Sequence, residues 1–169
     1  MCLISIQLRQ HAVYKLVLVA NRDEQYDRPA LPAHFWPDHP DLLAGKDLGA
    51  RGTWLGITKQ GRIAAVTNSY LITTQESDQK LSRGNLVMDY LTGNIGPEGY
   101  LEQIRQQRTD YNGFNLLIGS SDSLHHYNNI LDEISIIQTG SHAVSNATLD
   151  TPWPKVTLTK AAMAELASS

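Results

Sequence analysis

The alternation of apolar and polar positions at the start of the chain predicts a β-hairpin. Every even-numbered residue from 2 to 8 is apolar, with Ser5 and Gln7 between them, which is the period of a strand with one buried face. Residues 14–20 are mostly apolar on both faces, a pattern that favours a strand in the centre of a sheet. Residues 9–13 would form the turn that joins the two strands.

Similar patterns predict the remaining elements. Strands are expected at 53–57, 62–68, 112–121, 124–128, 133–138 and 142–146. Helical patterns occupy 83–92, 97–108 and 150–167. The last of these begins with Thr151 as N-cap and Pro152 as its first helical residue. The proline-rich segment 28–51 predicts an irregular loop, long enough to form a lid or a binding segment.

The order of these elements, strands then helices then strands then a helix, predicts an α+β fold. Tight turns between consecutive strands favour antiparallel sheets, and helices must cover at least one sheet face. The sequence holds no internal repeat, low-complexity tract or interdomain linker. We therefore expect residues 1–169 to form a single domain.

Composition narrows the function classes. The 169 residues include 14 Lys and Arg against 17 Asp and Glu, so a nucleic-acid partner is not expected. No apolar run approaches the roughly 20 residues of a membrane span, and the start lacks the basic segment of a signal peptide. The one cysteine cannot form an internal disulfide, which suits a reducing compartment. We expect a soluble, cytoplasmic protein without stable membrane insertion.

The single cysteine, Cys2, is the first candidate for chemistry. Its small side chain permits removal of Met1, which would leave a thiol and a free α-amine on one residue. The amine has a pKa of about 7.7–8.0 and can act as a base near neutral pH. A thiol of pKa about 8.5 is a competent nucleophile that a nearby base or cation improves. The alternative is that Cys2 is an ordinary small residue buried in a strand.

The polar run after the second strand offers partners for Cys2. If paired hairpin positions sum to about 22, Cys2 lies across from Ala20, and the residues that follow Ala20 surround the amino terminus. Asp23 would then orient the α-amine, and Arg22 would lower the pKa of the thiol. The alternative is a solvated strand end with an ordinary salt bridge.

Neighbouring residues of an extended segment point to opposite sides, so Arg22 and Asp23 should face in different directions. If Asp23 lies on the Cys2 side, Arg22 would belong to a structural ion pair with Glu24 or Asp27, or contact the proline-rich segment.

Two further predicted strands end in asparagine, at Asn68 and Asn146. An asparagine beside a nucleophile can donate a hydrogen bond to an oxyanion, although its usual role after a strand is in a turn. The candidate catalytic residues are Cys2, Asp23, Asn68 and Asn146. The candidate substrate-binding residues are Asn21, Arg22 and Trp54.

Metal binding is not expected. His125 and His126 are adjacent on a predicted strand, so they point to opposite faces. The segment HFWPDHPD at 34–41 holds two His and two Asp without a recognised ligand spacing.

Several longer stretches resemble a known family. They are MC at the start, LVLVANRDEQYDRPA (16–30), RGTWLGITKQGRIAAVTN (51–68), YNGFNLLIG (111–119) and VSNATLDTPWPKV (144–156). Together they resemble the NRDE-motif family, also called the transport and Golgi organisation family, from Met1 to about Lys155. The resemblance implies an N-terminal-nucleophile hydrolase-like αββα sandwich, in which two antiparallel sheets lie between helical layers.

Within that superfamily the chain is most similar to the choloylglycine amidases. The similarity implies Cys2 as the nucleophile, Asp23 as the residue that orients the amine, and Asn68 and Asn146 as oxyanion donors. Because Asp23 keeps the register of the amidases, the similarity also implies that Asp23, rather than Arg22, lies on the Cys2 side. Two features depart from the amidase pattern. The amidases have arginine two residues earlier than Arg22, and their second arginine lies beyond position 169.

The NRDE family is longer than this chain, so we expect its C-terminal strands to be absent. The sheet that would hold them should then have an open edge, which makes a homo-oligomer a candidate state.

Two function classes follow from the resemblance. The first is an N-terminal cysteine amidohydrolase or acyl-transfer enzyme that acts on a small amide or acyl substrate. The second is a non-enzymatic haem or acyl-lipid binding and trafficking protein, since the family is associated with secretory organisation, lipid and acyl-CoA balance and haem trafficking. No cofactor is expected, and haem is a candidate ligand only.

Overall fold

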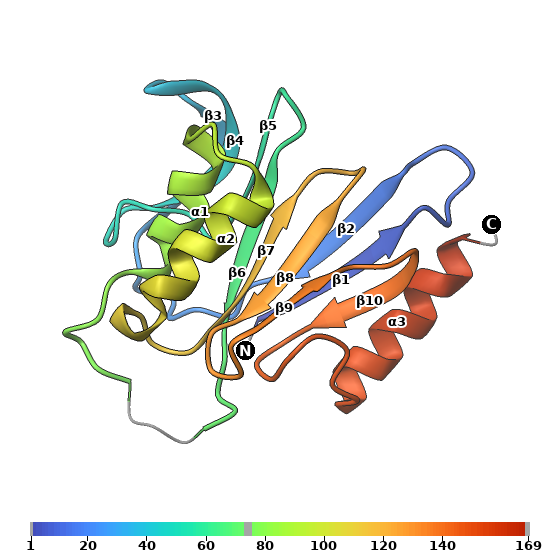
Figure 1. Ribbon diagram of the computed structural model, residues 1–169. Coiled ribbons are helices and arrows are strands. Elements are labelled where there is room, and N and C mark those ends of the chain that lie inside the picture. The colour runs from blue at the N-terminus through green and yellow to red at the C-terminus, as the bar shows by residue number, and fades with distance from the viewer. Residues whose placement is uncertain (1, 73–75, 168–169) are drawn as a thin grey trace.

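Two antiparallel sheets form the centre of that part of the molecule which the structure describes. The computed structural model describes residues 2–72 and 76–167, and Figure 1 shows the arrangement of their elements. The smaller sheet has three strands in the order β10-β1-β2, with β1 at Leu3–Leu8, β2 at Leu16–Asn21 and β10 at Gly140–Val144. The larger sheet has seven strands, β3 to β9, in chain order. Its strands are Ala30–Trp36, His39–Asp47, Leu55–Thr58, Ile63–Asn68, Phe114–Gly119, Leu124–Asn128 and Glu133–Ile136.

In the described part of the chain, three α-helices lie on the sheets. Helices α1 (Arg83–Thr92) and α2 (Pro97–Gln106) accompany the larger sheet, and α1 contacts β4 to β7. Helix α3 (Pro154–Ala167) packs against β1 and β10 of the smaller sheet. A short 3-10 helix, Arg108–Asp110, follows α2. The expected α+β composition with antiparallel sheets is therefore confirmed.

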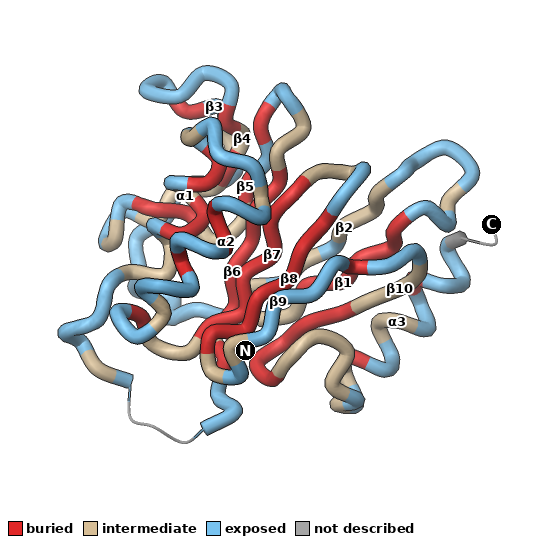
Figure 2. Tube along the Cα trace, in the orientation of Figure 1, coloured by how far each residue is buried: buried red, intermediate tan, exposed pale blue. Residues whose placement is uncertain are grey.

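Strand β6 shows how one strand serves two cores. Ala64 and Val66 belong to the apolar cluster shared with α1 and α2, whereas Ala65 belongs to the cluster that also contains Ile4 and Ile6 of β1. This division follows from the alternation of side chains along a strand. Each fully buried isoleucine or leucine in such a cluster contributes about 1.5–3 kcal/mol. Figure 2 shows the buried residues concentrated along β1, β6, β7 and β8.

The N-terminal hairpin forms as expected, but its register and its position in the sheet differ. Leu3 pairs with Asn21 and Ile4 with Ala20, so paired positions sum to 24 rather than 22. The turn is two residues longer than expected, and Arg9 N–H donates to the Lys15 carbonyl at 2.7 Å across it. Within the described residues β2 is an edge strand and not a central one, and Val19 is 54% exposed. The prediction that β2 is buried on both faces, which was based on its apolar residues, was therefore wrong.

The polar positions of β1 are also buried. Ser5 is 2% and Gln7 1% exposed, because α3 covers the face that the sequence pattern left to solvent. The Gln7 side chain donates a hydrogen bond to the Met163 carbonyl of α3.

The proline-rich segment 28–51 is not an irregular loop, and this prediction was wrong. It forms the β3–β4 hairpin, in which Leu31 pairs with Lys46 and Phe35 with Leu43. Pro32 is tolerated because β3 is an edge strand with a register shift between Leu31 and His34.

The last helix begins later than expected. Helix α3 starts at Pro154, so Pro152 is not its first helical residue. Thr151 instead closes a turn, because its hydroxyl donates to the Thr148 carbonyl at 3.0 Å and accepts from the Thr148 N–H at 3.2 Å.

Candidate functional site

The ends of three strands bring Cys2, Asn68 and Asn146 together. Strand β1 begins directly after Cys2, and its residue Ile4 pairs with Val144 at the end of β10, two residues before Asn146. The Ser145 hydroxyl donates to the Cys2 carbonyl at 2.8 Å, which ties the start of β1 to the end of β10. The two sheets thus meet at the candidate nucleophile.

Hydrogen bonds link the two candidate asparagines. The Asn146 Nδ2 donates to the Asn68 carbonyl at 3.0 Å, and the Asn68 Nδ2 donates to the Tyr70 hydroxyl at 2.8 Å. The Tyr70 backbone N–H returns a bond to the Asn146 carbonyl at 2.8 Å. Each asparagine amide carries two N–H bonds, and these contacts use one from each. Asn146 is only 2% exposed, so its side chain has a fixed orientation.

A cavity of about 370 Å³ opens beside this meeting point. Its lining includes Cys2, Asp23, Asn68 and Trp54, from four separate regions of the sequence. Asn21 reaches it indirectly, since the Asn21 Nδ2 donates to the Asp23 Oδ1 at 2.6 Å. The terminal ammonium of the chain and then the Asn21 amide lower the pKa of the Asp23 carboxyl, so Asp23 is ionised at neutral pH.

Arg22 also lines the cavity, but its guanidinium is held by carboxylates. The Arg22 Nη2 lies 2.9 Å from the Glu24 Oε2 and 3.4 Å from the Asp47 Oδ2. The expected ion pair with Glu24 is therefore present, and the contact with the segment 28–51 is made through Asp47. This engagement argues against Arg22 as the cation that activates the thiol.

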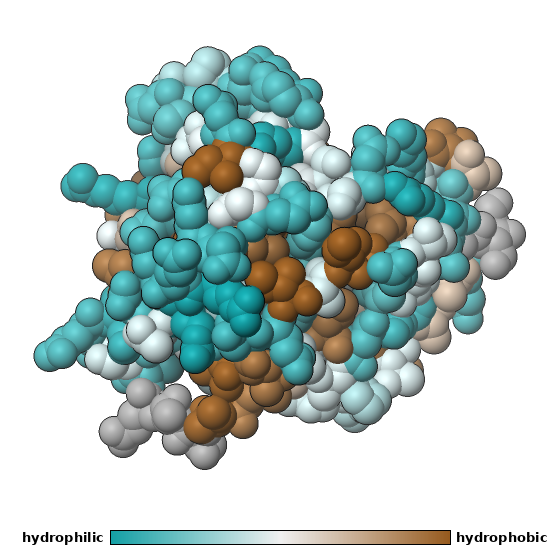
Figure 3. Space-filling view, viewed as in Figure 1, coloured by the Kyte–Doolittle hydropathy of each residue, from teal (hydrophilic) through white to brown (hydrophobic). Residues whose placement is uncertain are grey.

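Trp54 lies where the cavity meets a second, apolar groove. The groove has a volume of about 800 Å³ and is lined by Leu16 and Leu18 of β2 on one side and by residues of β4 to β6 on the other. Trp54, Leu31 and Gly45 line both spaces. Figure 3 shows the surface indented in this region, between the β1–β2 turn and the β5–β6 turn.

A buried polar network supports the strand ends, and the sequence interpretation missed it. The Asn115 Nδ2 donates to the Ala147 carbonyl at 2.7 Å and to the Thr67 hydroxyl at 3.2 Å. Thr67 in turn donates to the Ser145 carbonyl at 2.6 Å. The His126 Nε2 lies 3.0 Å from the Asn115 Oδ1, which as an amide oxygen can only accept, so the Nε2 carries the hydrogen. Burial lowers the pKa of His126 to about 4, so the ring is neutral. The network could have been suspected from the sequence, because polar residues occur inside otherwise apolar strands.

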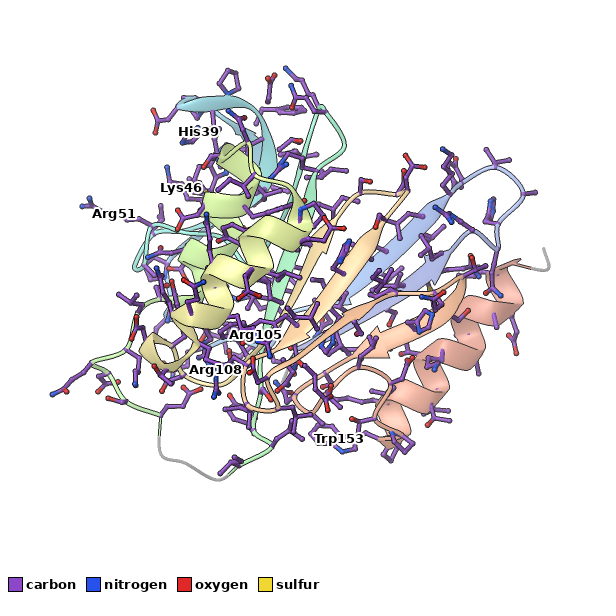
Figure 4. All side chains as sticks on the ribbon, viewed as in Figure 1. His39, Lys46, Arg51, Arg105, Arg108 and Trp153 are labelled. Carbon is purple, nitrogen blue, oxygen red and sulfur yellow. The ribbon has the colours of Figure 1, made fainter. Side chains whose placement is uncertain are left out.

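Other charged side chains have local partners outside the cavity. Figure 4 labels Arg105 and Arg108, which both approach Asp132, with the Arg105 Nε at 2.9 Å and the Arg108 Nε at 3.9 Å. His39 lies at the β3–β4 hairpin. Among residues 2–72 and 76–167 no three His, Cys, Asp or Glu side chains are grouped as a metal site would need. In the same residues no helix has the length and apolarity needed to cross a bilayer.

Comparisons with known proteins place these residues in a wider context. The model of a family described as Transport and Golgi organisation 2 matches residues 1–169. The mouse protein named Transport and Golgi organization 2 homolog is 38% identical over 169 residues, which cover 92% of this chain and 60% of the mouse protein. The human homolog is 37% identical with the same coverage. The Drosophila melanogaster protein Transport and Golgi organization protein 2 is 32% identical over 120 residues, 64% of this chain and 42% of that protein. The chain thus spans about three fifths of the length of its mammalian relatives.

Proposed function

Since the chain belongs to the Transport and Golgi organisation 2 family, we propose a function that its cavity supports: attack of the Cys2 thiol on the carbonyl carbon of a small amide or acyl substrate. One observation carries the proposal. Cys2, Asp23 and Asn68 line the same cavity, and Asn146 is hydrogen-bonded to Asn68 beside them.

The proposed reaction is that of an N-terminal cysteine hydrolase or acyl-transfer enzyme. After removal of Met1, the α-amine of Cys2 accepts the thiol proton, and the sulfur forms a bond to the carbonyl carbon. The carbonyl oxygen becomes an oxyanion, which accepts hydrogen bonds from the amides of Asn68 and Asn146. The leaving group departs with a proton, and water or a second acceptor then cleaves the acyl–sulfur bond.

Asp23 orients the α-amine in this scheme. A carboxylate beside an ammonium favours the charged amine and raises its pKa, so Asp23 would not make the amine a stronger base at neutral pH. Its hydrogen bond from Asn21 fixes the direction of the carboxylate. The two antiparallel sheets with helices on both support an N-terminal-nucleophile hydrolase-like sandwich as the scaffold of this site.

The apolar groove supports a second candidate function. It joins the cavity at Trp54, so a ligand could place a polar group near Cys2 and an apolar part between β2 and β5. A non-enzymatic binding or trafficking protein for an acyl lipid or haem would use the same two spaces. The names of the relatives refer to transport and Golgi organisation, and either function would let this chain serve that broad process.

Two measurements on the purified chain separate these functions. With p-nitrophenyl acetate we expect a burst of p-nitrophenolate, equal in amount to the protein, that is lost in Cys2→Ala. A reversible shift of the absorbance spectrum on titration with haemin, with Cys2 left unmodified by the ester, would favour the binding protein. Absence of both signals would contradict the acyl-transfer function and haem binding.

A further inference from the structure

Asp47, the last residue of β4, connects three parts of the cavity wall. Its Oδ1 accepts hydrogen bonds from the backbone N–H groups of Gly49 at 2.9 Å and Ala50 at 3.0 Å. Its Oδ2 lies 2.7 Å from the Arg28 Nε and 3.4 Å from the Arg22 Nη2. Both oxygens of one carboxylate are therefore occupied, and the side chain is only 11% exposed.

These bonds keep Asp47 charged. Burial alone would raise the pKa of the Asp47 carboxyl, but the Ala50 N–H and the Arg28 guanidinium outweigh it, and the pKa lies below its usual value. Bonds from backbone N–H groups and from arginine to an ionised carboxylate are among the stronger hydrogen bonds in proteins.

The partners of Asp47 lie on a segment with little backbone support of its own. Residues 22–25 and 29 have no regular secondary structure between β2 and β3. Arg22 and Arg28 both approach Glu24, at 2.9 Å and 4.0 Å, as well as Asp47. We define the charged strap as Arg22, Glu24, Arg28 and Asp47.

The strap adjoins Asp23 in the sequence, since Arg22 precedes it and Glu24 follows it. Asn21 bonds to Asp23 at 2.6 Å and Arg22 bonds to Glu24 at 2.9 Å, so alternate side chains pair with each other along residues 21–24. In an extended segment, side chains two apart share a side. When Asp47 holds Arg22, it therefore also sets the side from which Asp23 enters the cavity.

We propose that Asp47 is a positioning residue, which acts through Arg22 to fix Asp23 beside Cys2. This inference rests on the proposed function, because only that function requires Asp23 at a defined distance from the thiol. Asp47 has no role in bond making or breaking. Its loss should change the surroundings of the Cys2 thiol without removing any group that contacts substrate.

The rate of Cys2 alkylation by iodoacetamide, measured against pH, tests this role. Cys2 is the one cysteine in the chain, so each adduct reports on it alone, whether or not the protein turns over a substrate. We expect Asp47→Asn to move the midpoint of the profile in the same direction as Asp23→Ala and by at least half as much. In the Asp23→Ala background, Asp47→Asn should produce no further shift, since coupled residues are not additive.

Asp41→Asn is the matched control. Asp41 lies on the same strand and pairs with Lys59 at 3.3 Å, away from the strap, so its replacement should leave the profile unchanged. If Asp47→Asn does not fold, Arg22→Gln removes the same link while Asp47 keeps its turn and Arg28, and the same shift is expected. A residue with a purely structural role would lower the melting temperature without moving the midpoint.

The outcomes separate this inference from the proposed function. A wild-type profile for Asp47→Asn beside a shifted Asp23→Ala profile would overturn the positioning role alone. An independent, additive shift in the double variant would overturn it as well. A wild-type profile for Asp23→Ala would contradict the proposed function itself, and the positioning role with it.

Discussion

The two walls of the Cys2 cavity are built by different physical means. The strand-end wall, defined as Cys2 and Asn68, is held by neutral hydrogen bonds from Ser145 and Asn146, which lie behind it and are 1% and 2% exposed. The charged strap on the other side is held by ion pairs between partly exposed side chains, such as Arg22 at 22% and Glu24 at 34%. The wall that carries Cys2 and Asn68 is thus backed by buried residues, whereas the wall that carries Asp23 is not.

This difference predicts where substitutions will affect stability and where they will affect chemistry. A buried polar group that loses its partner costs the full desolvation penalty of that group, about 1–3 kcal/mol. An exposed ion pair contributes about 0–1 kcal/mol, because water can replace each partner. Substitutions of the buried residues that support the strand-end wall should therefore lower the stability of the fold. Substitutions in the charged strap should change the activity with little effect on stability.

The largest expected effect follows from removing the support of the strand-end wall. Asn115→Ala deletes the donor to the Ala147 carbonyl and the acceptor of the His126 ring in a fully buried setting. We expect a loss of about 3 kcal/mol in the free energy of unfolding, measured by urea titration. Asn94→Ala, at an exposed asparagine, is the control and should leave the midpoint unchanged. Equal midpoints for the two variants would show that the network does not stabilise the fold.

The second effect concerns Asp23 on the opposite wall. Asp23→Ala should slow formation of the Cys2 acyl adduct by about 100-fold, because a small displacement of a catalytic group can cost that much. The side chain is exposed, so the urea midpoint should not change. Asp27→Ala, in the same segment and also exposed, should keep the wild-type rate. A similar rate for both variants would remove Asp23 from the site.

The third effect is a dependence of stability on pH. The pKa of Asp47 is lowered in the folded protein, so its contribution is complete above the unfolded value of about 3.9 and is lost as pH falls through the folded value. The difference in melting temperature between the wild type and Asp47→Asn should therefore be largest near pH 7 and shrink below about pH 4. A difference that stays constant down to pH 2 would mean that the charge of Asp47 does not stabilise the strap.

The smallest effect is expected at the edge of the smaller sheet, away from both walls. Strand β2 pairs with β1 on one side, and in the described residues its other edge carries Val19 at 54% exposure. An open edge can pair with a second copy, and lysine on an edge strand opposes such pairing. Size-exclusion chromatography should show concentration-dependent association that Val19→Lys reduces. A monomer at all concentrations would contradict the predicted homo-oligomer.

The sequence predicted the regular elements well where local patterns decide them. The β5–β6 hairpin and helices α1 and α2 lie where periodicity and turn residues placed them. The prediction of an irregular loop at 28–51 was wrong because prolines are tolerated in an edge strand. Whether a strand lies at an edge depends on the whole sheet and not on local sequence. The prediction of β2 as a central strand was wrong for the same reason, since its place at the edge also depends on the whole sheet.

The residues of the candidate site also differ in whether local sequence could point to them. Cys2, Asn68 and Asn146 could be proposed from the sequence because each lies at one end of a predicted strand, and the structure brings these strand ends together. Asn115 and Asp47 were missed, because their importance depends on partners distant in sequence or on the other side of a loop. The Asn115 bond to Ala147, for example, spans 32 residues.

The most direct test of the central claim is the mass of the N-terminal tryptic peptide, residues 2–9, after treatment with p-nitrophenyl acetate. Protein from the native cell should yield a peptide that begins at Cys2 and carries one acetyl group, and Asp23→Ala should yield much less of the acetylated form. A peptide that retains Met1 in most molecules, or an unmodified Cys2 under conditions that release p-nitrophenolate, would contradict the proposal that Cys2 is an N-terminal nucleophile.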